Sequence, residues 1–284
     1  EKPGTGLAER LPGQFDYLLS IANLRIIPDV IVQRATRGAI NFHDGPLPRY
    51  AGINAPVWAL IAGEVEHGVS WHVMAGGPDE GDLLVQRLFP IEPSDTALTL
   101  NARCYEYGVD SFAELLERME ASNLAGTAQD LTQRTYFPKH KRPAGLGLID
   151  FAAPSEDIER LVRALHFGSY RNPVALAKLC AAGKAFYPTQ ASAQESASDA
   201  NPGTVLSVDG DKLVVATSST PIELSHFVRA DRSAIPADQV ARELGLIVGQ
   251  RIVGGASKDE LEQLAPLCQS EDAWVARLRR LDGV

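Results

Sequence analysis

Three polar side chains of the sequence are spaced in a way that could support proton transfer. Asn41 and His43 stand two residues apart at the end of the apolar stretch 38–42. Because residues i and i+2 of a strand point to the same side, both side chains would project from one edge of a sheet. Asp79 lies in a glycine-rich loop, 75–81, that follows another apolar stretch. A carboxylate near an imidazole orients the ring and favours its charged form.

An amide beside an imidazole is suited to acyl transfer. The imidazole can take or give a proton near neutral pH, and an amide N–H can donate to an oxygen that gains negative charge. Asn, His and Asp without a Ser, Cys or metal partner favour direct transfer to an amine, with no covalent enzyme intermediate. From spacing alone, the more common interpretation of an Asn-x-His pair in a strand is a hydrogen-bonded structural pair.

The elements that would position these residues alternate between strand and helix. Apolar runs bounded by glycine or polar residues predict the strands, and longer periodic stretches predict the helices. The strands are expected at 15–22, 38–42, 68–74 and 82–89, and the helices at 28–36, 54–61 and 96–122. This alternation indicates an α/β layer fold with parallel strand pairing. In such folds ligands bind at the carboxyl edge of the sheet.

The longest predicted helix, 96–122, carries a stripe of bulky residues. Ser94 and Asp95 before it are good N-cap candidates. The bulky residues recur at spacings of three, four or seven, which places them on one apolar face. They are Leu98, Tyr105, Val109, Phe112, Leu116 and Met119. Cys104 is expected to be a small buried residue on this helix.

The second half of the sequence has a different character. The segment 136–146 is rich in Pro, Lys and Gly and is typical of a linker. The segment 190–200 has few bulky residues and is predicted to be a flexible surface loop. Residues 204–216 form the clearest predicted hairpin, with Asp209-Gly210 as its turn, and indicate a small β-barrel. Further helices are expected at 237–245, 257–268 and 271–281.

Composition restricts the class of protein. The chain has 284 residues, with 27 Lys and Arg against 36 Asp and Glu, so its formal net charge is −9. This balance argues weakly against a nucleic-acid binder, which needs clustered basic residues. No apolar run approaches the roughly 20 residues of a membrane span, and no signal peptide opens the sequence. The cysteines, Cys104, Cys180 and Cys268, form no CxxC pair, which excludes a disulfide scaffold, gives no zinc signature and fits the reducing cytoplasm.

Four short motifs, in order along the chain, resemble those of the 10-formyltetrahydrofolate-dependent formyltransferases, a family that includes methionyl-tRNA formyltransferase. They are Asn41-Phe42-His43, the loop Leu47-Pro48-Arg49-Tyr50-Ala51-Gly52, the strand start Gly68-Val69-Ser70 and the loop Asp79-Glu80-Gly81. The resemblance extends over roughly residues 15–226. It overturns the structural interpretation of the Asn-x-His pair.

The resemblance implies catalytic roles for Asn41, His43 and Asp79. Asp82 is a nearby alternative to Asp79, but it follows the glycine, where the family does not place its acid. In the implied mechanism Asn41 donates to the oxyanion, Asp79 orients His43, and the imidazole acts either as a base or as an imidazolium. The implied co-substrate is 10-formyltetrahydrofolate, and the residues expected to bind it are Asn23, Leu24, Arg25, Ile26, Ile27, Gly76, Gly77 and Gly81.

The implied fold is α/β: a partial doubly wound, Rossmann-like formyltransferase sheet, followed by a small OB-like β-barrel and a helical tail. The expected domains are 1–135, a catalytic domain lacking its first β–α units, 136–230, a C-terminal formyltransferase-like domain, and 231–284, a helical tail or linker to a further module. The sequence begins with Glu1 rather than Met, so we expect a fragment of a larger enzyme. Where the family often has Ser two residues after its catalytic His, this chain has Gly45, which would remove one hydroxyl contact.

The sequence leaves the amine acceptor open. The loop 43–52 is similar to that of formylation domains of nonribosomal peptide synthetases, which favours an aminoacyl group on a carrier protein. Methionyl-tRNA, an amino sugar and a small amine are alternatives, with the acidic charge mildly against tRNA. Transfer to water and a degenerate docking module without activity are further alternatives. Of the other conspicuous residues, His72, Trp58 and Trp71 are expected to be structural.

Overall fold

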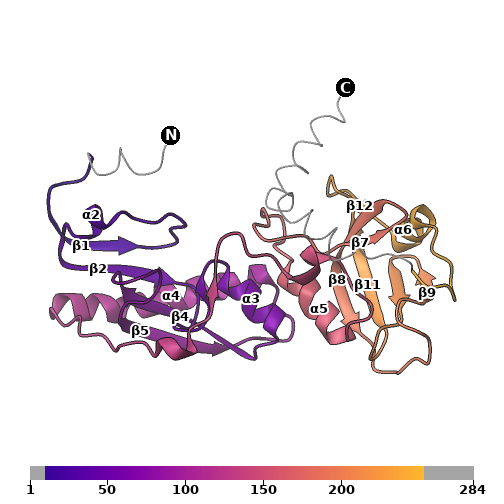
Figure 1. Ribbon diagram of the computed structural model, residues 1–284, viewed down its shortest axis with the longest axis horizontal. Helices are drawn as coiled ribbons and strands as arrows, with labels where there is room; N and C mark the ends of the chain where they lie inside the picture. Colours follow the sequence, from indigo (N-terminus) through magenta and orange to yellow (C-terminus); the bar gives the residue numbers. More distant parts are fainter. Residues whose placement is uncertain (1–9, 253–284) are drawn as a thin grey trace. The chain divides into compact units, whose positions relative to one another are not determined.

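The computed structural model describes residues 10–252 of the chain. They form two compact units (Figure 1). The first contains the described residues up to 59 together with 64–93 and 99–139, and the second contains 60–63, 94–98 and the described residues from 140 onward. Along these residues, no helix combines the length and the apolar character that crossing a membrane requires.

A four-stranded sheet lies at the centre of the first unit (Figure 1). Its strand order is β1 (Phe15–Ser20), β2 (Ala35–His43), β4 (Glu66–Val73) and β5 (Leu83–Pro90). β1 pairs with β2 in parallel, whereas the β2–β4 and β4–β5 pairs are antiparallel. The prediction of parallel pairing is therefore right for the first pair and wrong for the other two. The loop from β4 to β5 is too short for a parallel crossover, which needs about a dozen residues or more.

The helices of the first half of the chain are α2 (Asp29–Val32), α3 (Ala55–Ala62) and α4 (Ala97–Glu120). α2 is a single turn, shorter than the predicted 28–36, because β2 already begins at Ala35, which pairs with Phe15 of β1. The other two helices lie where they were predicted. Residues 55–60 of α3 are all buried, in keeping with their uniformly apolar sequence.

The buried face of α4 differs from the predicted one. Tyr105, Val109 and Leu116, three members of the predicted apolar face, are 46%, 73% and 40% exposed. The buried residues form a neighbouring stripe that contains several small side chains. They are Ala97, Leu100, Cys104, Gly108, Ser111, Leu115 and Met119. Cys104 and Met119 are buried as predicted.

Aromatic side chains of the sheet explain why small residues of α4 face the core. A Cβ atom at Gly108 would lie 2.6 Å from the Phe42 ring, so only glycine leaves room for that ring. The indole Nε1 of Trp71 donates a hydrogen bond of 2.9 Å to Ser111 Oγ. The bulky groups at this contact therefore come from the strands, and the helix supplies the space for them.

A short parallel pair fixes the loop that follows β2. It consists of β3 (Ala51–Gly52) and β6 (Tyr136–Phe137), so the segment predicted as a linker begins as a strand. A Cβ atom at Gly52 would lie 2.2 Å from the Phe137 carbonyl oxygen, and Gly52 has a φ of +103°. Glycine is therefore required for this close approach. The Phe137 ring stacks on Tyr50, with ring centroids 5.5 Å apart.

The second unit contains a six-stranded antiparallel sheet that curls as a half-barrel. Its strands run in the order β7 (Leu179–Ala181), β8 (Lys184–Ala193), β11 (Ile222–Val228), β10 (Lys212–Val215) and β9 (Val205–Asp209), with β12 (Ala234–Ile235) paired to β11. The predicted hairpin is confirmed, but Asp209 pairs with Lys212, so the turn residues are Gly210 and Asp211. The predicted surface loop begins later than expected, because 190–193 belong to β8.

Two helices pack on this half-barrel. α5 (Ser155–Ala164) contacts β8 and β11, with Ile158 and Val162 buried. α6 (Ala237–Leu244) matches the predicted helix and contacts β9, β10 and β11. It ends at Gly245, which has a φ of +65° and is in the left-handed conformation that favours glycine at helix ends. The helices predicted at 257–268 and 271–281 lie outside the described residues.

Candidate functional site

The end of β2 brings Asn41 and His43 to one edge of the sheet. Both lie on the same side of the strand, while Phe42 between them packs toward α4. Asn41 is partly exposed, whereas His43 is only 4% exposed. β1 ends beside them, because Ser20 pairs with Asn41 in the parallel register. The predicted placement of the amide and the imidazole at this edge is confirmed.

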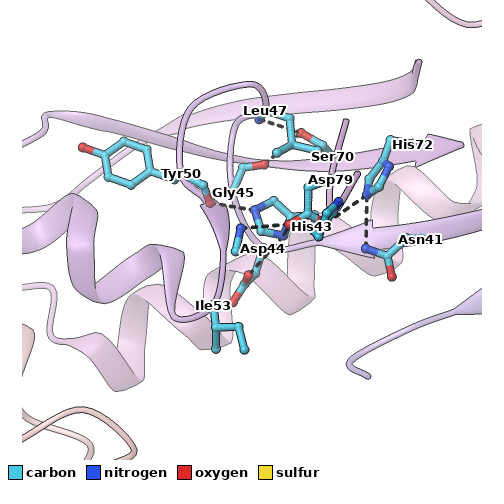
Figure 2. A network of polar contacts seen from close by, with 12 residues as sticks. Asn41, His43, Asp44, Gly45, Leu47, Tyr50, Ile53, Ser70, His72 and Asp79 are labelled. Carbon is cyan, nitrogen blue, oxygen red and sulfur yellow. Dashed lines mark hydrogen bonds and ion pairs between the residues drawn. The ribbon is translucent and has the colours of Figure 1, made fainter. Parts of the chain in front are cut away.

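The backbone of the following loop fixes the His43 ring. Its Nε2 lies 2.8 Å from the Tyr50 carbonyl oxygen (Figure 2). Because a carbonyl oxygen can only accept, Nε2 carries the hydrogen and Nδ1 holds the lone pair of the neutral ring. Nδ1 lies 3.9 Å from both Asp44 Oδ1 and Asp79 Oδ2. The Tyr50 carbonyl therefore makes the hydrogen bond that holds the ring, and Asp79 faces the opposite ring nitrogen.

Asp79 is held by contacts to both sides of the site. Its Oδ2 accepts a hydrogen bond of 2.8 Å from the Gly52 N–H, and its Oδ1 lies 3.4 Å from His72 Nε2. Burial raises the pKa of Asp79, but the His72 contact, the charge of His43 and the Gly52 N–H outweigh burial and lower the pKa to about 2. The side chain is therefore a carboxylate at neutral pH, and it lies between the imidazoles of His43 and His72.

The loop that carries Asp79 depends on a tight turn. A Cβ atom at Gly81 would lie 1.9 Å from the Val73 carbonyl oxygen, so no larger residue fits there. Gly77 donates its N–H to Glu80 Oε2 at 3.0 Å. Asp82, the alternative acid, is exposed, and its carbonyl accepts from the Val73 N–H. These contacts favour Asp79 over Asp82 as the acid of the site.

His72 is a member of the site that the sequence analysis missed. It was expected to be structural, yet its Nε2 lies 3.1 Å from Asn41 Nδ2 and its ring is 3% exposed (Figure 2). Its Nδ1 lies 2.9 Å from the Val73 carbonyl oxygen, so Nδ1 carries a hydrogen. Nε2 faces both the Asn41 amide and the Asp79 carboxylate: it accepts from the amide when the ring is neutral, and donates to the carboxylate when the ring is protonated. The antiparallel register, which pairs Asn41 with His72, creates this contact. The sequence predicts parallel pairing of β2 and β4, and that arrangement gives no reason to expect a contact between Asn41 and His72.

The four side chains form one continuous polar network (Figure 2). It runs from the Asn41 amide to His72, from His72 to the Asp79 carboxylate, and from Asp79 to His43 Nδ1, over distances of 3.1, 3.4 and 3.9 Å. The network can bind and relay protons through two imidazoles beside one fixed negative charge. The second N–H of the Asn41 amide remains available to an oxygen that gains negative charge.

Gly45 has a steric role in this network. A Cβ atom at position 45 would lie 2.8 Å from His43 Nε2 and 3.0 Å from Ala55 Cβ. Ser70 Oγ donates to the Gly45 carbonyl oxygen at 2.8 Å and accepts from the Leu47 N–H at 3.1 Å. The Ser70 hydroxyl, on β4, thus holds the loop that contains Gly45.

The segment expected to bind folate follows β1. Asn23 closes this loop on itself, because its Oδ1 accepts from the Arg25 N–H at 3.0 Å and its Nδ2 donates to the Arg25 carbonyl at 2.8 Å. Leu24 and Ile26 are 76% and 91% exposed. Since Ser20 pairs with Asn41, this exposed apolar loop leaves the sheet at the same edge as the polar network. Across residues 10–252, His, Cys, Asp and Glu nowhere gather in a group that could hold a metal ion.

Sequence comparison identifies relatives over both units. A sequence model described as formyl transferase matches residues 10–116, and one described as formyl transferase, C-terminal domain, matches residues 144–245. Methionyl-tRNA formyltransferase of Acidithiobacillus ferrooxidans is 31% identical over 235 residues, which are 83% of this chain and 72% of that protein.

Solved structures with a similar fold include HypX from Aquifex aeolicus in complex with tetrahydrofolic acid. The likeness has a TM-score of 0.62 at 22% identity and covers 86% of this chain but only 41% of HypX. The N-formyltransferase from Helicobacter canadensis, solved with folinic acid and dTDP-3-aminofucose, has a TM-score of 0.54 at 21% identity and covers 66% of this chain and 65% of that one. At these identities the likeness concerns the fold.

Proposed function

Because the chain belongs to the formyltransferase family, we propose that it transfers the formyl group of 10-formyltetrahydrofolate to the nitrogen of an amine. The observation that carries this proposal is the polar network that links Asn41, His72, Asp79 and His43 at one edge of the sheet. The tetrahydrofolic acid of HypX and the folinic acid of the Helicobacter enzyme support a folate as the donor.

The loop after β1 fits a folate. Leu24 and Ile26 offer exposed apolar side chains, and the Asn23–Arg25 turn fixes the backbone between them. A flat ring with polar edges suits such a surface, because apolar side chains cover its faces and fixed backbone groups meet its edges. We propose that residues 23–27, with Gly76, Gly77 and Gly81 of the Asp79 loop, bind the folate.

The side chains have distinct roles in the proposed reaction. The amine nitrogen bonds to the formyl carbon, the bond from that carbon to the folate nitrogen breaks, and the proton that the amine loses is the one that the folate nitrogen gains. The Asn41 amide donates an N–H to the formyl oxygen as its negative charge grows. His43 takes the amine proton on Nδ1, and the carboxylates of Asp44 and Asp79, both 3.9 Å away, stabilise the imidazolium that results.

The acceptor we favour is an aminoacyl group on a carrier protein. The support is the likeness of loop 43–52 to formylation domains of peptide synthetases. Its relatives offer two alternatives, since one is a methionyl-tRNA formyltransferase and another was solved with an amino-sugar nucleotide.

We also retain the expected domains: a catalytic domain at 1–135, a C-terminal domain at 136–230 and a tail at 231–284. We further propose that the protein acts in the cytoplasm.

Formyl transfer can be tested directly. The chain is incubated with 10-formyltetrahydrofolate and a panel of aminoacyl-loaded carrier protein, methionyl-tRNA, an amino-sugar nucleotide and free amino acids, and the gain of one formyl group is read by mass spectrometry. We expect one acceptor class to be formylated, and His43→Ala to lower the rate by about 10²–10⁴-fold. Asp82→Asn, an exposed acid nearby, is the matched control and should retain the wild-type rate.

Two results would contradict the proposal. One is wild-type turnover by a folded His43→Ala variant, which would remove the imidazole from the reaction. The other is release of formate without formylation of any amine in the panel, because that outcome would make the chain a hydrolase. Thermal unfolding of each variant establishes that the fold is retained.

A further inference from the structure

His67 is a fully buried histidine of β4 that the proposed reaction does not use. Its relative exposure is 0%. Its Nε2 lies 2.9 Å from the Asp44 carbonyl oxygen, and its Nδ1 has no hydrogen-bond partner. Since a carbonyl oxygen only accepts, Nε2 carries the hydrogen, and a buried Nδ1 without an acceptor favours a neutral ring. Burial lowers the pKa of His67 to about 4, against the opposing effect of the Asp44 carbonyl, which agrees with a neutral ring.

The ring of His67 touches the loop at the two residues that surround His43. Through Nε2–H it holds the backbone of Asp44, whose carboxylate lies 3.9 Å from His43 Nδ1. Edge-on it meets the Tyr50 ring, with centroids 6.1 Å apart, and the Tyr50 carbonyl accepts from His43 Nε2. The Tyr50 hydroxyl donates to Glu64 Oε1 at 2.7 Å, which anchors that residue from the other side.

Packing alone does not explain a histidine at this position. The Phe89 ring packs edge-on against it, with centroids 6.0 Å apart, so the surroundings are largely aromatic. An apolar residue would fill the same space without leaving a buried nitrogen unpaired. What an apolar residue cannot supply is the N–H that fixes the Asp44 carbonyl.

We propose that His67 is a positioning residue for formyl transfer, which holds the Asp44 carbonyl through Nε2–H and thereby sets His43 between its carbonyl and carboxylate partners. This inference rests on the proposed function. It assigns His67 no contact with either substrate. Loss of its N–H should therefore slow the chemical step and leave folate binding unchanged.

The test compares variants that keep or lose the donor. Gln has an amide nitrogen that can replace Nε2, whereas Leu has no donor. For His67→Leu we expect kcat of formyl transfer to fall roughly 10-fold or more, with the dissociation constant of tetrahydrofolate, measured by calorimetry, within about twofold of the wild-type value. His67→Gln should restore kcat to within about threefold of the wild-type value. Val69→Ala, a fully buried change on the same strand, controls for a general loss of stability.

Defined outcomes overturn the proposal. The first is a wild-type kcat in His67→Leu. The second is a kcat of His67→Gln as low as that of His67→Leu. The third is a loss of kcat in Val69→Ala equal to that in His67→Leu. If His67→Leu does not fold, His67→Asn, whose side chain is too short to reach Asp44, provides the same contrast with Gln. If the wild type formylates no acceptor in the panel, ¹⁵N NMR of His43 tests the positioning role without an activity readout. The Nε2–H tautomer of His43 should be uniform in the wild type and mixed in His67→Leu.

Discussion

At the scale of single residues, the site is built from two imidazoles with different partners. His43 presents Nδ1 to the carboxylates of Asp44 and Asp79, because the Tyr50 carbonyl occupies Nε2. His72 presents Nε2 to the Asn41 amide, because the Val73 carbonyl occupies Nδ1. Backbone carbonyls thus select opposite tautomers in the two rings. One ring is left free to take a proton, and the other fixes the amide that would bind an oxyanion.

The buried imidazole of His67 makes the fold sensitive to acid. Burial lowers its pKa from 6.5 to about 4, although the nearby charges of Asp44 and Glu64 oppose that shift and His43 adds to it. A histidine whose pKa is lower in the folded chain stabilises the fold above the unfolded pKa, and this stabilisation is lost as pH falls from about 6.5 to about 4. Between pH 7 and pH 5 the loss should be about 2 kcal/mol.

Urea unfolding of the wild type and of His67→Gln at pH 7 and pH 5 measures this term. All other titrating groups are shared, so the wild type should lose about 2 kcal/mol more than the variant over this range. Equal losses in the two proteins would mean that the folded chain accommodates a charged His67. Far-UV circular dichroism at both pH values establishes that each protein starts from the folded state.

Residue types and spacing placed Asn41 and His43 at one edge of the sheet and Asp79 in a glycine-rich loop, because a strand of period two and such a loop are local patterns, whereas their catalytic roles were implied by the family resemblance. His72 could not be found in this way. Its role depends on which residue of β2 it faces, and that is set by an antiparallel register between strands far apart in sequence. The role of the Tyr50 carbonyl could not be predicted either, since the residue type does not reveal what its backbone groups will contact.

At the scale of elements, α4 shows why bulky residues are an unreliable guide to a buried face. Its limits and its amphipathic character could be predicted, but the face could not. Gly108 and Ser111 turn inward because Phe42 and Trp71 of the sheet need the space and the hydrogen bond. A periodicity that weighs only large residues therefore selects the neighbouring stripe, which is exposed at Val109.

A pair of truncations on α4 distinguishes the two faces. Leu100 is 0% exposed and Val109 is 73% exposed. Leu100→Ala should lower the free energy of unfolding by about 3 kcal/mol, because it leaves a cavity in the core. Val109→Ala should change it by no more than about 0.5 kcal/mol, as expected for a surface position. Urea unfolding of both variants provides the comparison, and a larger cost for Val109→Ala would restore the face expected from the sequence.

At the scale of the whole molecule, the order of the main strands and helices in the first half of the chain was predictable, whereas the direction of most strand pairing was not. Alternating elements indicated an α/β layer, and only the β1–β2 pair is parallel as expected. The hairpin at 204–216 likewise indicated the antiparallel second sheet, but its turn lies one residue later. Such details depend on contacts between distant segments, which local patterns do not contain.

Net charge bears on which acceptor the whole molecule can bind. The formal charge is −9, and a field of this sign repels a polyanion while it hardly affects a small amine. A phosphate backbone also requires clustered Lys and Arg, whose binding weakens steeply with salt. We therefore expect a fluorescently labelled tRNA to bind more weakly than about 0.1 mM at physiological salt, as measured by anisotropy.

The dependence of activity and binding on salt separates the acceptor classes. Formyl transfer to an aminoacyl carrier or a small amine should change little between about 50 and 200 mM salt, because few counterions are released. A methionyl-tRNA formyltransferase would instead lose affinity for its acceptor by about 10³-fold or more over that range if it contacted six or more phosphates. Micromolar tRNA binding with that salt dependence would show that local basic surface outweighs the overall charge, and would make tRNA the acceptor to pursue.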